Sequence, residues 1–520
     1  MNKQKWYPIV YYAVFVILMI GVLMNKKNFH VDEIYSYGLS NHIGGPALSF
    51  EQGKEYQPAS IPYDNYVTVA ENERFQYKNV WENQRKDNHP PLFYAILHTI
   101  CSFFPGTFSI WYAGVINIVF ACITLYFVRK LLCFFIEDGK IRAVLTVVFI
   151  ASPGILSAVS FLRMYIMAMA WVTILTWLLV VKEKEDKKVS FWVKVFLTVL
   201  AGALTHYYCI VYTVFISVVY GVCLLIRRDW KNFGKLCLTM LLAAGCSIAI
   251  FPAMLKHIFK SARGTEAMNN FSSHVSGVFS DRIKEFVRII NGQLFGNLLR
   301  WILLLMILLL IAIVVKSIKK EEEKHWRLSL DDVQKYIVAF LPMVCYFLMI
   351  GKIAAYLSDR YMFPVYALLQ MSIMGTLTVL LVKIMPKRTG IACAGVLLWV
   401  MTANIWKIGE WKYLYLSSVP LLEQEKAYED VDCLYIYDAE WKTQASFMEV
   451  PGYHSVTFIK NDDLQLLKDT ACAEKDRLIV VVIGDREQIL GQIQDICPQL
   501  TEIETIGEYS YGKTSYLHGN

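Results

Sequence analysis

The stretch His30-Val31-Asp32-Glu33-Ile34-Tyr35 opens a polar segment that Asn88-His89-Pro90-Pro91-Leu92-Phe93-Tyr94 closes, in a chain that is otherwise largely hydrophobic. The first run comes a few residues after a hydrophobic segment long enough to be a membrane helix. Adjacent carboxylates are costly beside a membrane, so their presence there indicates a function. We therefore expect the active site in this polar segment.

The composition predicts an α-helical polytopic membrane protein. Of the 520 residues, 56% are hydrophobic and only 18% are charged, whereas a soluble protein has about 25% charged residues. A helix needs about 20 predominantly apolar residues to cross the hydrocarbon core. Runs of this kind predict about eleven spans, at 7–24, 110–131, 142–158, 164–181, 190–205, 206–226, 234–255, 296–316, 333–351, 361–383 and 390–407.

The distribution of Lys and Arg predicts which side each loop faces, because short cytoplasmic loops are enriched in basic residues. The N-terminus and the basic loops between later spans then lie inside, so the net charge of +7 reflects topology and not a nucleic-acid partner. The first polar loop, 25–109, and the C-terminal tail face outward. This arrangement requires that residues 89–104 do not cross, and we expect an interfacial or re-entrant helix there.

The last fifth of the chain differs in character from the membrane part. Runs rich in β-branched and aromatic residues at 434–437 and 478–484 predict strands. We expect two domains. Residues 1–406 form the membrane module, which includes loop 25–109, and residues 407–520 form a small extracytoplasmic α/β domain.

Asp32 and Glu33 are the first candidate catalytic residues. Adjacent side chains point in different directions, so one carboxylate is able to face a substrate while the other orients the loop or a partner. A carboxylate within hydrogen-bond reach of an acceptor hydroxyl is able to take its proton during group transfer. The alternative is an acidic pair at a helix N-terminus that only favours the helix dipole.

The run that begins at His89 closes the same loop. Pro90 and Pro91 lack backbone donors and fix the start of the following helix, so His89 is held at the membrane surface by a stiff hinge. The alternative is an ordinary helix start. We expect His89, Pro90 and Tyr94, with Tyr35 from the opening run, to belong to the active-site loop.

Basic residues at the outward ends of spans are exceptions to the inside-positive distribution, so each indicates an anionic partner. Arg163, Lys352 and Arg360 have this position, and a lipid phosphate fits because guanidinium binds phosphate oxygens bidentately. His206 lies at another outward junction and is able to donate to the same phosphate. The alternatives are an ion pair of Arg360 with Asp359 or another acidic side chain, snorkelling of Arg163 to headgroups, and a packing role for His206.

These features together resemble the GT-C superfamily, specifically the bacterial relatives of protein mannosyltransferases and aminoarabinose transferases. The resemblance covers about residues 1–406 and implies that Asp32 is the catalytic carboxylate with Glu33 as its neighbour. It also implies that Arg163, His206 and Arg360 lie on the phosphate side of the site. The motifs that carry it are Asp32-Glu33, the His89–Tyr94 run, Arg163-Met164-Tyr165, His206-Tyr207-Tyr208 and Asp359-Arg360-Tyr361.

The resemblance implies a transferase that moves a sugar from a polyprenyl-phosphate donor to a hydroxyl acceptor on the outer face of a bacterial cytoplasmic membrane. Asp32 would act as general base in a single displacement, which inverts the anomeric centre. The acceptor is a protein, a cell-wall polymer or a glycolipid, membrane lipids are the other partners, and no nucleic acid is expected.

Two other functions are weighed against this one. A polymerase or ligase of lipid-linked oligosaccharides would be favoured by a large outer loop late in the chain, whereas here the large loop is the first. A non-enzymatic flippase or transporter of lipid-linked sugars would place its charges near the bilayer midplane and show inverted repeats or broken helices. The candidate charges here cluster at outward helix ends.

No cofactor is expected, with a divalent cation held by His30, Asp32, Glu33 and His89 as the alternative. The pattern Gly507–Thr514 matches a phosphate-binding loop, but such a loop needs a helix behind it, and only residues 515–520 follow. We therefore interpret it as a coincidence.

Overall fold

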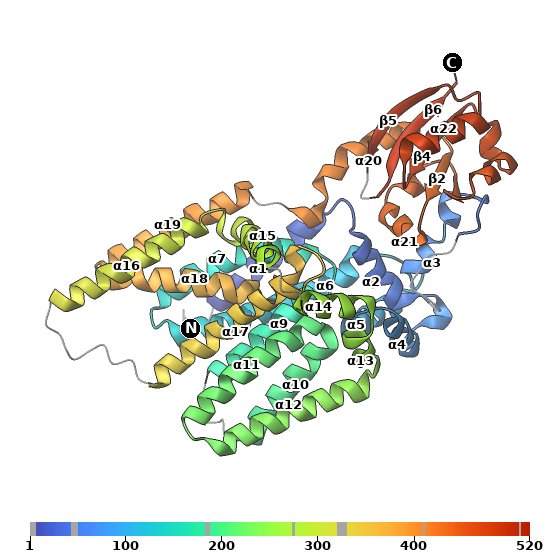
Figure 1. Ribbon diagram of the computed structural model, residues 1–520. Helices are drawn as coiled ribbons and strands as arrows, with labels where there is room; N and C mark the ends of the chain where they lie inside the picture. The colour runs from blue at the N-terminus through green and yellow to red at the C-terminus, as the bar shows by residue number, and fades with distance from the viewer. Residues whose placement is uncertain are drawn as a thin grey trace. The chain divides into compact units, whose positions relative to one another are not determined.

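The computed structural model describes residues 7–42, 50–181, 188–272, 276–319, 330–408, 411–508 and 511–519. The chain is predominantly helical (Figure 1) and divides into two compact units. The membrane unit consists of Met1–Val22, Asn88–Phe93 and Ala113–Glu410, and the mixed unit consists of Leu23–Asp87, Tyr94–Tyr112 and Trp411–Asn520.

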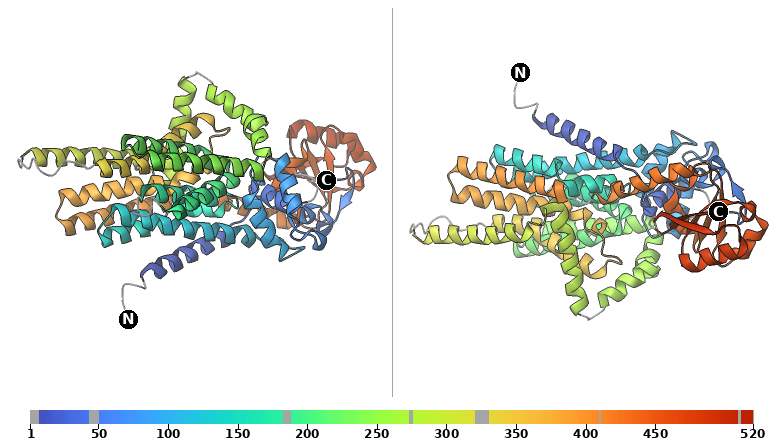
Figure 2. Two further views of the ribbon diagram at one scale, coloured as in Figure 1. Left: turned by 90° about the horizontal axis from the view of Figure 1, so that it is seen from below. Right: turned by 90° about the horizontal axis from the view of Figure 1, so that it is seen from above.

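The membrane unit consists of apolar helices, whose long members run roughly parallel in both views of Figure 2. Its helices are α1 (Tyr7–Met24), α6 (Ile110–Phe135), α7 (Gly139–Ile150), α8 (Pro153–Ser160), α9 (Tyr165–Val180), α10 (Val189–Thr205), α11 (Tyr207–Ile226), α12 (Trp230–Ile250), α13 (Ala253–Phe259), α14 (Ala262–Ser272), α15 (Ser276–Phe295), α16 (Leu299–Lys319), α17 (Leu330–Ile353), the short η4 (Asp359–Tyr361), α18 (Phe363–Ile384) and α19 (Lys387–Ile408).

The polytopic α-helical class predicted from the composition is confirmed, and the count of about eleven spans stays a prediction. Within the described residues, seven helices are long and apolar enough to cross a membrane, or eight if the pair α7 and α8, bent by 42°, is one span. Shorter apolar helices, of 10–17 residues, lie at the other three predicted positions, namely Ile9–Met24 within α1, Tyr165–Val180 and Val189–Thr205. Hydropathy alone does not distinguish a buried core helix of this length from a span.

The segment that was required not to cross is a short helix, α5 (Leu92–Ser102), of 11 residues. At 1.5 Å per residue it is about 17 Å long, which is too short for a hydrocarbon core of about 30 Å. Pro90 and Pro91 directly precede it, as expected for residues that fix a helix start.

The mixed unit contains a six-stranded sheet in the order β1-β3-β2-β4-β6-β5. Strands β2, β3 and β4 are parallel, and the hairpin of β5 and β6 pairs antiparallel to β4. Figure 1 shows α22 against this sheet. The bounds are β1 (Glu55–Tyr56), β2 (Cys433–Tyr437), β3 (Val456–Lys460), β4 (Arg477–Val482), β5 (Glu502–Glu508), β6 (Lys513–His518), α20 (Val419–Glu425), α21 (Glu440–Thr443) and α22 (Arg486–Ile496).

The strands follow from their sequences, because β2 and β4 are continuous runs of buried side chains, as expected for parallel strands covered on both faces. The phosphate-loop pattern falls on β5 and β6, with Tyr509 and Ser510 outside the described residues. Strands and not a helix flank it, so the interpretation as a coincidence holds.

The outer loop and the tail share one core. Strand β1 comes from the loop and pairs antiparallel with β3 of the tail. Phe50 stacks on Phe458 with ring centroids 3.8 Å apart, and the Tyr63 hydroxyl donates to the Thr443 carbonyl at 2.7 Å. The loop also forms α2 (Val31–Asn41), α3 (Tyr63–Val67) and α4 (Tyr77–Lys86).

Gly38 lies in the middle of α2 directly against the ring of the fully buried Tyr66. A Cβ at this position would overlap the ring, so Gly38→Ala should destabilise the protein by about 1–3 kcal/mol. Thermal unfolding of the purified full-length protein measures this. Gly491→Ala, on the exposed face of α22 with no atom within 4 Å of the added Cβ, is the matched control and should be neutral or stabilising. Equal effects of the two substitutions would contradict the packing described.

Candidate active site

The candidate site begins at the N-terminus of α2, where the sequence forms a capping box. His30 is the N-cap, and its Nδ1 accepts a hydrogen bond from the backbone N–H of Asp32 at 3.1 Å. In return, the carboxylate of Glu33 accepts from the backbone N–H of His30 at 2.6 Å. These bonds satisfy backbone donors that a helix start leaves unpaired, and they fix the direction of the first turn.

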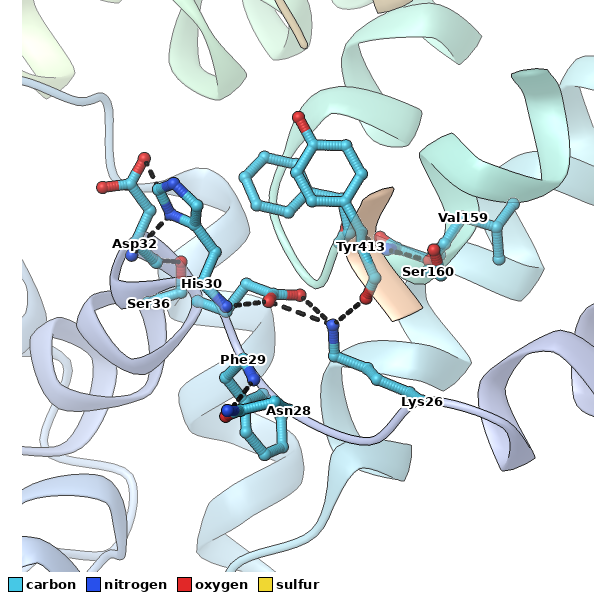
Figure 3. Close-up of polar contacts among 12 residues, drawn as sticks. Lys26, Asn28, Phe29, His30, Asp32, Ser36, Val159, Ser160 and Tyr413 are labelled. Atoms are coloured by element: carbon cyan, nitrogen blue, oxygen red, sulfur yellow. Dashed lines mark hydrogen bonds and ion pairs between the residues drawn. The ribbon is translucent and has the colours of Figure 1, made fainter. Parts of the chain in front are cut away.

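Glu33 forms a buried ion pair with Lys26. The ammonium lies 3.0 Å from the carboxylate, and the two side chains are 1% and 0% exposed. Lys26 also donates to the Tyr413 carbonyl at 2.6 Å, and Figure 3 shows its ammonium at this junction. Burial lowers the pKa of Lys26, and the adjacent Glu33 opposes that shift. The contacts of Glu33 therefore position the helix, whereas its predicted part in the chemistry stays untested.

Asp32 has a different environment from its neighbour. Its side chain is 29% exposed, and one carboxylate oxygen lies 3.7 Å from Nδ1 of His30. Figure 3 shows the two side chains facing each other at the start of α2. Asp32 is thus the more accessible carboxylate of the pair.

A second carboxylate, Asp87, belongs to the same neighbourhood. Burial raises the pKa of Tyr35 to about 12, and the negative charges of Asp87 and Asp32 contribute in the same direction. Both carboxylates therefore act on one tyrosine. Sequence reasoning missed Asp87, although it directly precedes the Asn88-His89-Pro90 run. Tyr94, the other predicted loop tyrosine, is fully buried in α5.

In the membrane unit, four of the predicted residues come together. Arg163 lies 3.3 Å from Nε2 of His89, and the His89 ring centroid is 6.0 Å from that of His206. Arg163, Arg360 and His89 all act electrostatically on His206. Two guanidinium groups lie beside two imidazole rings, and the charge of the guanidinium groups makes this an electropositive centre. We call His89, Arg163, His206 and Arg360 the cation cluster.

Breaks between helices position the cation cluster. Arg163 lies in the interruption between α8 and α9, where the Asn117 side chain donates to the carbonyls of Val159 and Phe161 at 2.9 and 2.8 Å. These bonds satisfy backbone groups that the broken helix exposes, which a nonhelical segment at membrane depth requires. His206 similarly ends α10 and caps α11 through its ring.

Arg360 lies in η4, which Asp359 stabilises. The Asp359 carboxylate accepts from the backbone N–H of Arg360 at 2.9 Å and from the side chain of Gln293 at 2.7 Å. The Arg360 guanidinium lies 5.3 Å from the centroid of the Tyr361 ring. Asp359 thus bonds the backbone of Arg360.

Lys352 and Pro90 complete the predicted set. The Lys352 ammonium lies 5.2 Å from the centroid of the Phe271 ring, and Pro90 is buried before α5.

Arg282, from α15, was not predicted, yet it donates to the Gly351 carbonyl at 2.8 Å and acts on Tyr208, a ring neighbour of His206. It lies inside an amphipathic helix without a flanking motif, so the sequence carried no signal for it.

No group of three or more His, Cys, Asp or Glu side chains is arranged to hold a metal ion within the described ranges. In the set considered for a cation, Glu33 is engaged with Lys26. Independence from metals stays a prediction.

A buried carboxyl of the tail also contacts the segment before α2. The Asn28 side chain donates to the Glu449 carboxyl, which is 3% exposed as a residue. Burial raises the pKa of Glu449 to about 8, an effect that the nearby Glu425 reinforces. Glu449 therefore carries a proton in the folded protein at neutral pH.

Replacement of either partner should show how much the Lys26–Glu33 pair contributes to the stability of the fold. Because removal of one charge leaves the other buried alone, Lys26→Met or Glu33→Gln should destabilise the protein by about 3–5 kcal/mol. The double variant should recover much of this loss. Thermal unfolding measures all three, with Lys54→Met, in an exposed pair with Glu51, as the control that should leave Tm unchanged. Single variants as stable as the wild type would contradict a structural role.

The raised pKa of Glu449 predicts a pH dependence of stability. The folded protein holds this proton between the ordinary pKa of 4.5 and about 8, whereas the unfolded chain releases it, so stability falls as the pH rises through this window. The slope is at most about 1.4 kcal/mol per pH unit. Glu449→Gln should flatten the decline in Tm between pH 5 and pH 8.5. A variant with the same decline as the wild type would show that Glu449 does not cause it.

The comparison with known families concerns the membrane unit. Residues 89–330 match the model of Glycosyltransferase family 87, a membrane GT-C-like family. This stretch contains His89, Arg163 and His206 of the cation cluster and ends before Arg360. The search of curated proteins found no match. The match supports the predicted class of enzyme, a glycosyltransferase, and residues 89–330 are the part of the chain that is similar to family 87.

Proposed function

We propose that the protein transfers a sugar from a polyprenyl-phosphate donor to a hydroxyl acceptor at the outer face of the bacterial cytoplasmic membrane, with inversion and with Asp32 as general base. A glycosyltransferase requires a sugar donor and an acceptor, and a lipid-linked donor suits a protein whose helices are able to cross a membrane. The outward location follows from the inside-positive distribution of basic residues.

The observation that carries the proposal is the cation cluster. When the anomeric bond breaks, negative charge develops on the leaving phosphate, and preorganised cations stabilise it. The guanidinium groups of Arg163 and Arg360 match phosphate oxygens bidentately, and His206 and His89 supply further ring nitrogens. Arg163 is 3% exposed and His206 is 6% exposed, so screening by water is weak at these two side chains.

Asp32 supplies the second requirement, a base for the acceptor. It is partly exposed, and the capping box fixes the helix turn that carries it. The acceptor oxygen forms a bond to the anomeric carbon and passes its proton to Asp32, while the bond from that carbon to the phosphate oxygen breaks. The lipid phosphate leaves with the electron pair. One in-line displacement inverts the anomeric centre, and no nucleotide takes part.

Removal of the base tests the proposal. Asp32→Asn keeps the size of the side chain but not its proton affinity, so transfer should fall by about 10²–10⁴-fold, the range for general base catalysis. Mass spectrometry of surface glycans from cells that carry the variant measures transfer. The lipid-linked sugar that co-purifies with the protein measures donor binding, which should persist.

Asp463→Asn, at an exposed carboxylate of the tail, is the control and should transfer normally. Undiminished transfer by Asp32→Asn would remove Asp32 from the mechanism. Loss of the co-purified donor along with activity would point to a donor-binding role for Asp32 instead.

A further inference from the structure

The tail sheet has a switch point in its strand order. Strand β2 is central, with β3 on one side of it and β4 on the other. The chain first adds β3 on one side of β2 and then crosses to the other side to form β4. The switch point therefore lies at the carboxyl end of β2. In open α/β sheets, ligands bind outside the carboxyl ends of the strands at such a switch point. Residues 438–446 follow β2 there, and the start of β6 lies at the same edge because Val482 pairs with Lys513.

Two exposed aromatic side chains stand at this edge. Trp441 is 41% exposed and Tyr511 is 37% exposed. Their ring centroids are 5.4 Å apart with the planes at 76°. The ammonium of Lys442 lies over the Trp441 ring and pairs with Asp438 at 2.5 Å. The edge therefore combines exposed aromatic rings with charged groups that are able to form hydrogen bonds.

The same edge reaches the helix that carries Asp32. The short helix η8 (Gln444–Ser446), which directly follows α21, packs against α2. The Gln444 side chain approaches the hydroxyls of Tyr35 and Tyr66. Tyr511 also acts electrostatically on Tyr35, as Asp32 does. Groups of the tail and the proposed base thus share one neighbourhood within the mixed unit.

This combination matches the chemistry of a saccharide. A pyranose ring has an apolar C–H face that packs on an aromatic ring, and its rim of hydroxyls both donates and accepts hydrogen bonds. The carboxylates of Asp87 and Asp438 suit such hydroxyls. One hydroxyl of the same molecule is the nucleophile that the proposed reaction needs.

We propose that the acceptor is a saccharide chain, whose rings bind on Trp441 and Tyr511 at the carboxyl edge of the tail sheet while one hydroxyl reaches Asp32. This inference rests on the proposed role of Asp32. It assigns acceptor recognition to the tail and excludes a plain peptide as the preferred acceptor.

Binding of defined probes to the full-length protein tests the inference without catalysis. Saturation-transfer NMR in nanodiscs compares four tetrasaccharides, namely maltotetraose, cellotetraose, chitotetraose and mannotetraose, with a Ser/Thr-rich heptapeptide. At least one tetrasaccharide should bind, and Trp441→Ala and Tyr511→Ala should each weaken its binding at least tenfold. Trp441→Phe, which keeps an aromatic face, should retain most of it.

Tyr428→Ala is the matched control, because Tyr428 pairs with Tyr516, whose β6 segment pairs with β4 toward the opposite edge of the sheet. It should leave binding unchanged, and all variants should keep the wild-type Tm. Binding should also survive Asp32→Asn, so failure of the proposed chemistry and failure of this inference are separate results. The inference would be overturned if the peptide alone bound or if none of the saccharides bound. It would also be overturned if both alanine variants bound saccharides as well as the wild type.

Discussion

The buried ion pair between Lys26 and Glu33 is the interaction on which the mixed unit most depends. Two charges without water are stable only when they meet with good geometry and further hydrogen bonds. Here the ammonium also bonds the Tyr413 carbonyl, and the carboxylate also bonds the backbone of His30. The pair therefore fixes the first turn of α2 and leaves Asp32 as the accessible carboxylate.

The same unit joins parts of the chain that lie far apart in the sequence. Tyr413 and Glu449 of the tail contact Lys26 and Asn28, and β1 of the outer loop extends the tail sheet. The start of α2 is thus built by the loop and the tail together. The tail therefore contributes contacts to the start of the helix that carries Asp32, which is why we propose that it recognises the acceptor.

The sequence predicted those features that depend on local pattern. Hydropathy located the apolar helices. The basic residues at helix ends that were predicted to face outward included Arg163 and Arg360, and the fold brings these two together with His206. Features that arise only in the folded chain could not be predicted from the sequence. The burial of Glu33 depends on Lys26 and Tyr413, and Asp87 and Gln444 approach Tyr35 through tertiary packing.

The central claim is that the cation cluster holds the lipid phosphate while Asp32 serves the acceptor. A cryo-electron microscopy structure of the full-length protein with decaprenyl phosphate bound tests it most directly. We expect phosphate oxygens within about 3 Å of guanidinium nitrogens of Arg163 or Arg360, with the Asp32 carboxylate open to the space that the sugar would occupy. A phosphate bound away from both arginines, or an Asp32 turned away from that space, would contradict the claim.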